Sequence, residues 1–205
     1  MSVNISYANS PVYNFAGILP IVKDEENQNW LYFGVEYKIK EPQLAILGGA
    51  KERKDKTAAE TAIRELNEES LNVLEDYINI NNLEKLSRHK IDYHLMFLFN
   101  IKLYLTPIDF KLQNTKSCEY FLTEYKHRRL DKPEHYKKLA KSQQESYEIR
   151  RVKVSDLIKF LESPEKNDYK LTSYGYPDCT KPTPIKLRWS SRVLLQNQPA
   201  LKKIL

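Results

Sequence analysis

Blocks of apolar residues separated by short polar stretches predict the secondary structure of the first fifty residues. Residues 15–22 (FAGILPIV) and 30–37 (WLYFGVEY) are largely apolar, and the polar stretch KDEENQN lies between them. Such runs, bounded by polar residues, are typical of buried strands that form a hairpin. A third short strand, residues 43–47 (QLAIL), is expected to end at the pair Gly48 and Gly49.

An amphipathic helix is expected after the charged loop AKERKDK that follows the glycine pair. Thr57 is a suitable N-cap residue, and Glu60 stands three residues later, which is the spacing of a capping box. The apolar residues that follow recur at the spacing of one helical face. They are Ala59, Ala62, Ile63 and Leu66.

The second half of the chain predicts two further strands with a long connection between them. Residues 92–105 (DYHLMFLFNIKLYL) are expected to form one long strand, and residues 147–163 a strand followed by a helix that begins near Ser155. The connection, about 106–144, is too long for a hairpin loop and is expected to be a helical or irregular insertion. The element order predicts an α+β fold with a mixed, partly antiparallel central sheet and helices on both faces.

Two regions are expected along the chain, residues 1–162 as the main domain and residues 163–205 as a basic C-terminal extension. The extension is expected to pack on the domain or to trail from it. The formal net charge is +6, and the last twenty-five residues carry six Lys or Arg residues with no Asp or Glu. This distribution favours a polyanionic partner such as RNA, although a solvated basic tail explains it equally well.

The composition also indicates the cellular compartment in which the protein is expected. No apolar run approaches the roughly 20 residues needed to cross a bilayer, and no membrane partner is expected. The N-terminal sequence lacks the basic start and apolar block of a signal peptide. Cys118 and Cys179 are far apart and have no metal-ligand spacing, so free thiols in a reducing, cytoplasmic setting are expected.

The end of the predicted helix gathers three glutamates, Glu65, Glu68 and Glu69, within an arc of roughly 100° beside its apolar face. Like charges at this spacing repel, and the C-terminal end of a helix disfavours anions. Arg64 can offset part of this charge but cannot neutralise three carboxylates. Oxygen ligands on one helix face suit Mg²⁺ or Mn²⁺. A solvated acidic helix end is the alternative.

The stretch GGAKERKDKTAAETAIRELNEES, residues 48–70, resembles the Nudix box, whose pattern is G-x5-E-x7-R-E-U-x-E-E-x-G-U with U aliphatic. Counted back from Arg64, Ala50 stands where the box has glycine and Lys56 where it has its first glutamate. No glycine follows Glu69. The resemblance covers roughly residues 15–162 and implies a Nudix-like α/β/α sandwich.

The resemblance implies metal-dependent hydrolysis of a phosphoanhydride bond in a nucleoside diphosphate linked to another moiety. Glu65, Glu68 and Glu69 would be metal ligands, with Glu65 also a candidate base, and Arg64 would hold a glutamate in place. The remaining candidates are backbone carbonyls of the glycine pair as metal ligands and two acidic residues before the last strand of the fold. They are Gly48, Gly49, Glu145 and Glu148. Either of the two acidic residues could instead be an ordinary surface glutamate.

Basic residues suggest what the substrate is. Four cations of the loop before the helix are candidates for phosphate binding, or are ordinary solvated residues: Lys51, Arg53, Lys54 and Lys56. The positive charge and the basic insertion favour capped RNA, dinucleoside polyphosphates or diphosphoinositol polyphosphates as substrates, and ADP-ribose-like or sugar-nucleotide substrates remain open. A solvated amphipathic helix is the alternative interpretation of the basic insertion. Tyr174, Tyr176 and Trp189 could stack on a base or pin the C-terminal segment. The alternative function is a catalytically inactive Nudix-like module that binds RNA or a protein partner. The oligomeric state is left open.

Overall fold

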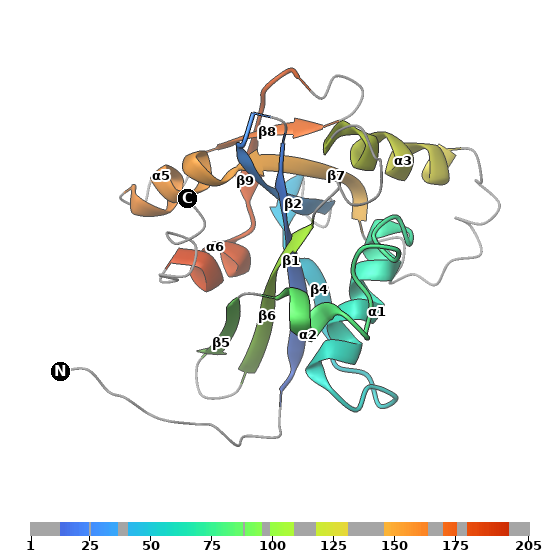
Figure 1. Ribbon diagram of the computed structural model, residues 1–205. Coiled ribbons are helices and arrows are strands. Elements are labelled where there is room, and N and C mark those ends of the chain that lie inside the picture. The colour runs from blue at the N-terminus through green and yellow to red at the C-terminus, as the bar shows by residue number, and fades with distance from the viewer. Residues whose placement is uncertain are drawn as a thin grey trace.

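A computed structural model describes residues 13–24, 26–36, 41–87, 89–95, 99–108, 118–130, 146–163, 170–175 and 180–196. Over these residues nine strands form one mixed sheet, in the order β3-β9-β8-β7-β2-β1-β6-β5, with β4 paired to β1 off this path. The sheet stands between two groups of helices, α1 and α2 on one side and α5 and α6 on the other (Figure 1). The expected α+β class, with a sheet-rich core, is confirmed.

The first two strands form the expected hairpin. β1 (Phe15–Lys23) pairs antiparallel with β2 (Asn29–Glu36), with Val22 opposite Trp30. The turn is organised by Asp24, whose Oδ1 accepts a hydrogen bond of 2.7 Å from the backbone N–H of Gln28. Its Oδ2 accepts one of 2.7 Å from the indole Nε1 of Trp30. The polar stretch between the strands therefore folds as a hydrogen-bonded turn.

The predicted third strand differs from the expectation in one respect. It is divided at Ile46 into β3 (Gln43–Ala45), which pairs with β2, and β4 (Leu47–Ala50), which pairs with β1. The glycine pair does not end the strand, because Gly48 lies opposite Gly17 in the ladder between β1 and β4. A Cβ atom on Gly48 would lie 2.5 Å from the Cα of Gly17. Two glycines in register thus let these strands approach closely.

The prediction of one long strand over residues 92–105 is wrong. This apolar run forms a hairpin of β5 (His89–Leu95) and β6 (Phe99–Ile108), in which Leu95 lies opposite Phe99. β6 in turn runs parallel to β1. The segment from Leu95 to Phe99 is wholly apolar, so its sequence fits one long strand or two shorter ones equally well.

The region after residue 162 is built into the sheet. β7 (Ser146–Lys153) and α5 (Val154–Glu162) form the expected strand and helix. β8 (Leu171–Gly175) then pairs with β7, and β9 (Thr183–Leu187) pairs with β8 and β3 before α6 (Trp189–Gln196). Over the described residues, β8 and β9 therefore lie in the same sheet as β7. Neither β8 nor β9 was predicted, because the sequence of this segment is polar and rich in turn residues.

The expected insertion is described only in part. Its first residues, 106–108, belong to β6, and α3 (Cys118–Leu130) lies within it. Leu122 and Tyr125 of α3 are buried, and they belong to the same hydrophobic cluster as the inner face of α1. α3 therefore packs on the α1 side of the sheet.

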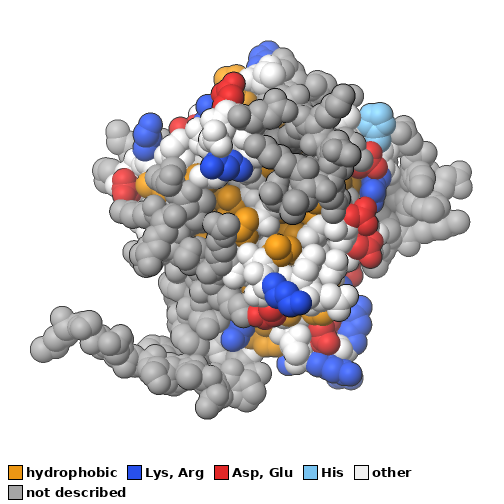
Figure 2. Space-filling model, in the orientation of Figure 1, with side chains coloured by type: hydrophobic (Ala, Val, Ile, Leu, Met, Phe, Trp, Pro, Cys, Tyr) orange, Lys and Arg blue, Asp and Glu red, His pale blue; other side chains and the backbone are white. Residues whose placement is uncertain are grey.

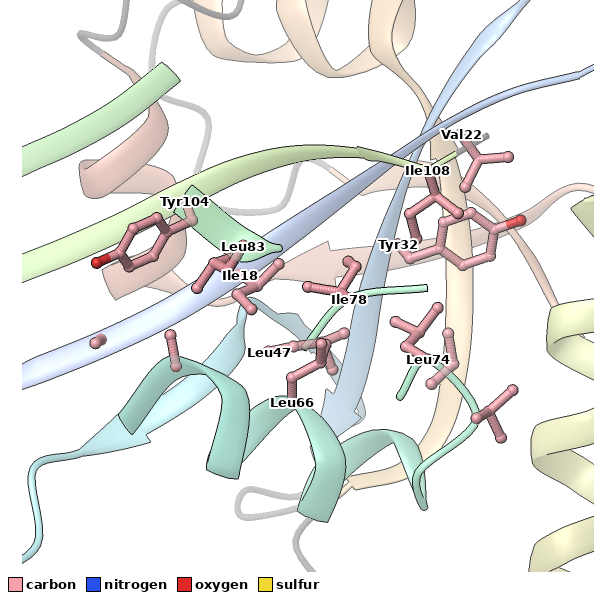
Figure 3. Close-up of a cluster of buried hydrophobic side chains, with 14 of the residues drawn as sticks. Ile18, Val22, Tyr32, Leu47, Leu66, Leu74, Ile78, Leu83, Tyr104 and Ile108 are labelled. Carbon is pink, nitrogen blue, oxygen red and sulfur yellow. The ribbon is translucent and has the colours of Figure 1, made fainter. Parts of the chain in front are cut away.

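The core next to α1 (Ala58–Ser70) holds the candidate site in place. Leu66 of α1 and Leu47 of β4 are completely buried and belong to one cluster (Figure 3). α2 (Leu83–Leu86) adds the buried Leu83 to the same cluster. A separate cluster on the opposite face packs α5 and α6 against the sheet. In the part of the chain that the structure describes, no helix is long and apolar enough to cross a membrane.

Candidate active site

The helix that carries the glutamates begins as the sequence predicts. The Thr57 side chain accepts a hydrogen bond of 3.2 Å from the Glu60 backbone N–H, and a Glu60 carboxylate oxygen accepts one of 3.0 Å from the Thr57 backbone N–H. This reciprocal capping box fixes where α1 starts. Ala59, Ala62 and Leu66 are buried beneath the helix, so its rotation about its own axis is also fixed. Glu65, Glu68 and Glu69 consequently stand beside the buried face.

Glu69 reaches the first glycine of the pair. Its Oε2 accepts a hydrogen bond of 2.7 Å from the backbone N–H of Gly48, and the residue is only 5% exposed. The carbonyl groups of the two glycines stay predicted metal ligands. The structure shows a backbone amide of β4 holding a carboxylate of α1. This contact joins the strand to the end of the helix.

Glu65 lies directly against the second glycine. A Cβ atom placed on Gly49 would lie 2.3 Å from the Oε1 and from the Cδ of Glu65, so a side chain at position 49 would displace the carboxylate. Burial raises the pKa of Glu65, and the neighbouring Glu68 and Glu52 raise it further, while hydrogen bonding to Arg64 opposes them. Glu65 is therefore a largely buried carboxylate, with 12% of its side chain exposed, and its position depends on the absence of a side chain at Gly49.

Arg64 stands at the centre of the carboxylates. Its Nη1 lies 2.6 Å from Glu65 Oε1 and 3.4 Å from Glu68 Oε2. Glu52, in the loop before the helix, places its Oε1 3.5 Å from the same nitrogen. The Arg64 side chain is 11% exposed, and those of Glu65 and Glu68 are 12% and 15% exposed. The expected contact between Arg64 and a glutamate is thus present, and it involves three glutamates at one nitrogen.

The structure adds Asp55, which the sequence analysis did not select. Asp55 Oδ2 lies 3.0 Å from Arg64 Nη2, and Oδ1 lies 3.3 Å from Arg64 Nε, so the carboxylate pairs with two nitrogens of the guanidinium. Oδ2 also accepts hydrogen bonds from the Thr61 hydroxyl at 2.8 Å and from the Glu52 backbone N–H at 2.9 Å. Burial works to raise the pKa of Asp55, but these hydrogen bonds outweigh it and hold the pKa at about 2.

Asp55 and Lys56 differ in their exposure to solvent. Lys56, the residue that the resemblance aligned with the first glutamate of the box, is exposed. The side chain of the preceding Asp55 is 4% exposed. The sequence signal for Asp55 was its place next to position 56, where the box pattern has a glutamate.

The other end of α1 closes without the glycine of the box. Leu71 takes a left-handed conformation with φ 54°, and its backbone N–H donates to the Asn67 carbonyl. This conformation usually requires glycine. Arg128 of α3 donates a hydrogen bond of 3.1 Å from Nη1 to the Leu71 carbonyl and lies 2.9 Å from Glu124 through Nε. A cation from the insertion therefore supports the C-terminal end of the helix.

Glu148 is not brought to these carboxylates. On β7, Ile149 belongs to the core beneath α1, whereas Glu148 lies opposite Val35 of the core on the other face. Successive side chains of a strand point to opposite faces, so Glu148 and the α1 glutamates lie on different sides of the sheet. Its Oε1 is 3.0 Å from Arg150 Nε. Glu145 lies outside the described residues, as does Tyr176.

The four candidate phosphate-binding residues of the loop are all exposed. Lys54 Nζ lies 3.1 Å from Glu52 Oε2, and Lys51 Nζ lies 4.7 Å from the centre of the Tyr13 ring. Tyr13 is itself fixed, since its hydroxyl donates to the Thr57 carbonyl at 2.6 Å. The first residue of the loop, Lys51, thus contacts a buried tyrosine, and the loop ends at the N-cap of the helix.

The fit of a divalent cation can be judged from the donors present. Glu52, Glu65, Glu68 and Glu69 offer only carboxylate oxygens, the donors that Mg²⁺ and Mn²⁺ prefer. Gly49 leaves room for the Glu65 carboxylate beside the strand. Over the described residues, however, no three acidic, His or Cys side chains are already gathered around one point that could hold a metal. The donor types fit, while Arg64 Nη1 lies between the carboxylates of Glu65 and Glu68.

Comparison of the chain with protein-family models and with curated proteins gave no match.

Proposed function

We propose that this protein is a Mg²⁺- or Mn²⁺-dependent hydrolase of the Nudix type, with a Nudix-like α/β/α sandwich. It cleaves a phosphoanhydride bond in a nucleoside diphosphate linked to another moiety. The observation that carries the proposal is the packing of Glu65 and Glu69 of α1 against Gly49 and Gly48 of β4. The box resemblance names the same residues.

The charge balance of the site supports a bound cation. Four carboxylates, of Glu52, Asp55, Glu65 and Glu68, lie within 3.5 Å of the single guanidinium of Arg64. Asp55 already engages two of its nitrogens. Asp55, Glu65 and Glu68 are largely shielded from solvent, and like charges in such a place are costly unless they are paired with cations. We infer that Glu65 and Glu68 would hold a divalent ion in place of their contact with Arg64 Nη1, while Asp55 would keep the guanidinium in position.

Each residue has a role in the proposed reaction. A divalent ion supplies charge neutralisation at the phosphate oxygens and a lowered pKa for a bound water. Glu65 and Glu68 would hold it, together with Glu69, whose Oε2 is oriented by the Gly48 amide. Glu65 is also the candidate base, since its carboxylate could accept a proton from the attacking water. Arg64 orients Glu65, and Asp55 orients Arg64.

A second function, RNA binding without catalysis, has its own support in Trp189. This tryptophan opens α6 and is 62% exposed, and the side chain of the adjacent Arg188 is 42% exposed. Exposed aromatic and guanidinium groups are suited to stacking on unpaired bases. Arg188 is, however, committed to Glu36 at 2.8 Å, which gives it a structural role as well. We therefore rank this function second.

A substrate panel tests the first proposal. Capped RNA, ADP-ribose, dinucleoside polyphosphates and nucleoside triphosphates are incubated with Mg²⁺ or Mn²⁺, and the release of phosphate-containing products is measured. Turnover of one class is expected to require the metal and to fall at least about 100-fold in Glu68→Gln. Glu75→Gln, at an exposed position just beyond the helix, is the matched control and should retain full activity. Absence of turnover with every substrate, combined with RNA binding that Trp189→Ala abolishes, would favour the second function.

A further inference from the structure

We infer that the basic loop (residues 51–56) is a preformed site for additional phosphate groups, and that the substrate carries more phosphates than the two joined by the cleaved bond. This inference rests on the proposed function, since it places the extra phosphates beside the bond to be cleaved. Its evidence lies in the rigidity of the loop, in its outward charge and in its connection to the carboxylates.

The loop is held in one shape by hydrogen bonds at both ends and at its centre. The Lys51 backbone N–H donates to the Asn14 carbonyl at 2.9 Å, and Arg64 Nη2 donates to the Ala50 carbonyl at 2.9 Å. At the centre, the Asp55 N–H donates to the Glu52 carbonyl at 3.1 Å, and the Glu52 N–H donates to the Asp55 carboxylate at 2.9 Å. A loop fixed in this way loses little conformational entropy when it binds a ligand.

The acidic and basic side chains of the loop differ in whether they point into the protein or into solvent. Asp55 turns inward and is neutralised by Arg64, whereas the four cations of the loop are exposed. The outer surface therefore presents four positive groups and one carboxylate, that of Glu52. Figure 2 shows Lys and Arg side chains at the lower right of the molecule, where Figure 1 places the connection between β4 and α1. Such a surface attracts anions and raises their local concentration.

A short chain of contacts links the loop to the proposed reaction centre. Lys54 Nζ lies 3.1 Å from Glu52 Oε2, Glu52 Oε1 lies 3.5 Å from Arg64 Nη1, and that nitrogen lies 2.6 Å from Glu65. A phosphate chain that reacts at Glu65 and Glu68 would meet this loop with its neighbouring phosphates. Arg53 can bind a phosphate through two N–H groups, and the lysines act as point charges.

Binding of inorganic anions tests the loop without any need for turnover. Calorimetry on the full chain compares tripolyphosphate with pyrophosphate, for the wild type and for the double variant Arg53→Gln/Lys56→Gln. The wild type is expected to prefer tripolyphosphate, and the double variant is expected to lose at least about tenfold of its tripolyphosphate affinity and most of this preference. Added salt should weaken tripolyphosphate binding more in the wild type than in the variant.

The control is Lys85→Gln/Lys159→Gln, which removes the same charge from exposed positions of α2 and α5. It should bind tripolyphosphate like the wild type. Equal loss in both double variants would reduce the effect to net charge and overturn the inference, as would equal affinity of the wild type for the two anions. Failure of the proposed function would appear differently, as an absence of metal-dependent turnover while loop-dependent anion binding persists.

Discussion

Asp55 pairs with two nitrogens of the Arg64 guanidinium, with Oδ2 3.0 Å from Nη2 and Oδ1 3.3 Å from Nε. The pair fixes two directions at once. It turns Arg64 Nη1 toward Glu65 and Glu68, and it draws the centre of the basic loop onto the helix. The Asp55 carboxylate therefore holds Arg64 in place from the loop that precedes its helix.

Replacement of Asp55 by asparagine should lower the free energy of unfolding by about 2 kcal/mol at neutral pH, since the pKa falls from 3.8 to about 2 on folding. A lowered pKa means that the stabilisation is complete above about pH 4 and is lost as the pH falls toward 2. Urea unfolding at several pH values measures this. The curves of the variant and the wild type should converge in acid, whereas Asp76→Asn, at an exposed site, should match the wild type throughout. A difference that stays constant with pH would contradict the pairing.

Gly48 and Gly49 should respond differently to replacement by alanine. At position 49 the new Cβ meets the Glu65 carboxylate, a side chain that can move away, so metal affinity and activity should fall with little loss of stability. At position 48 it meets the Cα of Gly17 at 2.5 Å and the carbonyl oxygen of Ala16 at 2.8 Å, which are backbone atoms of β1. Gly48→Ala should therefore lower the melting temperature strongly. Equal melting temperatures for the two variants would argue against this arrangement of β4.

Arg128 should stabilise the end of α1 that carries the glutamates. Arg128→Met removes the hydrogen bond to the Leu71 carbonyl and should lower the free energy of unfolding by about 1 kcal/mol. Glu124→Gln removes only the partly exposed ion pair with Arg128 and should change it by less than about 0.5 kcal/mol. Urea unfolding of both variants separates the two contacts. Similar losses in the two would show that the ion pair, and not the helix cap, is what matters.

The raised pKa of Glu65 predicts a pH dependence of opposite sign to that of Asp55. The folded protein holds the Glu65 proton more tightly than the unfolded chain, so ionisation of Glu65 costs stability as the pH rises above about 4.5. In metal-free buffer, the free energy of unfolding of Glu65→Gln relative to the wild type should increase from pH 4 to pH 7. A relative decrease over this range would place the pKa of Glu65 below its ordinary value instead.

Local sequence patterns predicted the helix and its cap because those features depend on neighbouring residues. Thr57 and Glu60 form the expected capping box. Of the expected apolar face, Ala59, Ala62 and Leu66 are buried and Ile63 is partly buried. Pairings between distant segments could not be predicted in this way. The strands around Ser173 and Ile185 are short and polar, and they are strands because β7 and β3 offer them partners.

In the candidate site too, contacts between neighbouring residues could be predicted and contacts that depend on distant segments could not. Arg64 was expected to contact a glutamate, and it does, because the two are neighbours on one helix. Asp55 was not predicted as a site residue, because the hydrogen bonds of the loop decide which of its side chains faces Arg64. Counting residues back from Arg64 does not reveal this. Glu148 was a reasonable candidate by position along the chain, but the face to which it points depends on the pairing of β7 with β2.

The central claim is that the glutamates of α1 bind a divalent cation, and titration of Mn²⁺ into the metal-free protein tests it most directly. Calorimetry should show saturable binding to the wild type that is lost in Glu68→Gln and unchanged in Glu148→Gln, whose carboxylate lies on the opposite face of the sheet. No saturable binding to the wild type, or binding that Glu68→Gln and Glu148→Gln weaken equally, would contradict the claim.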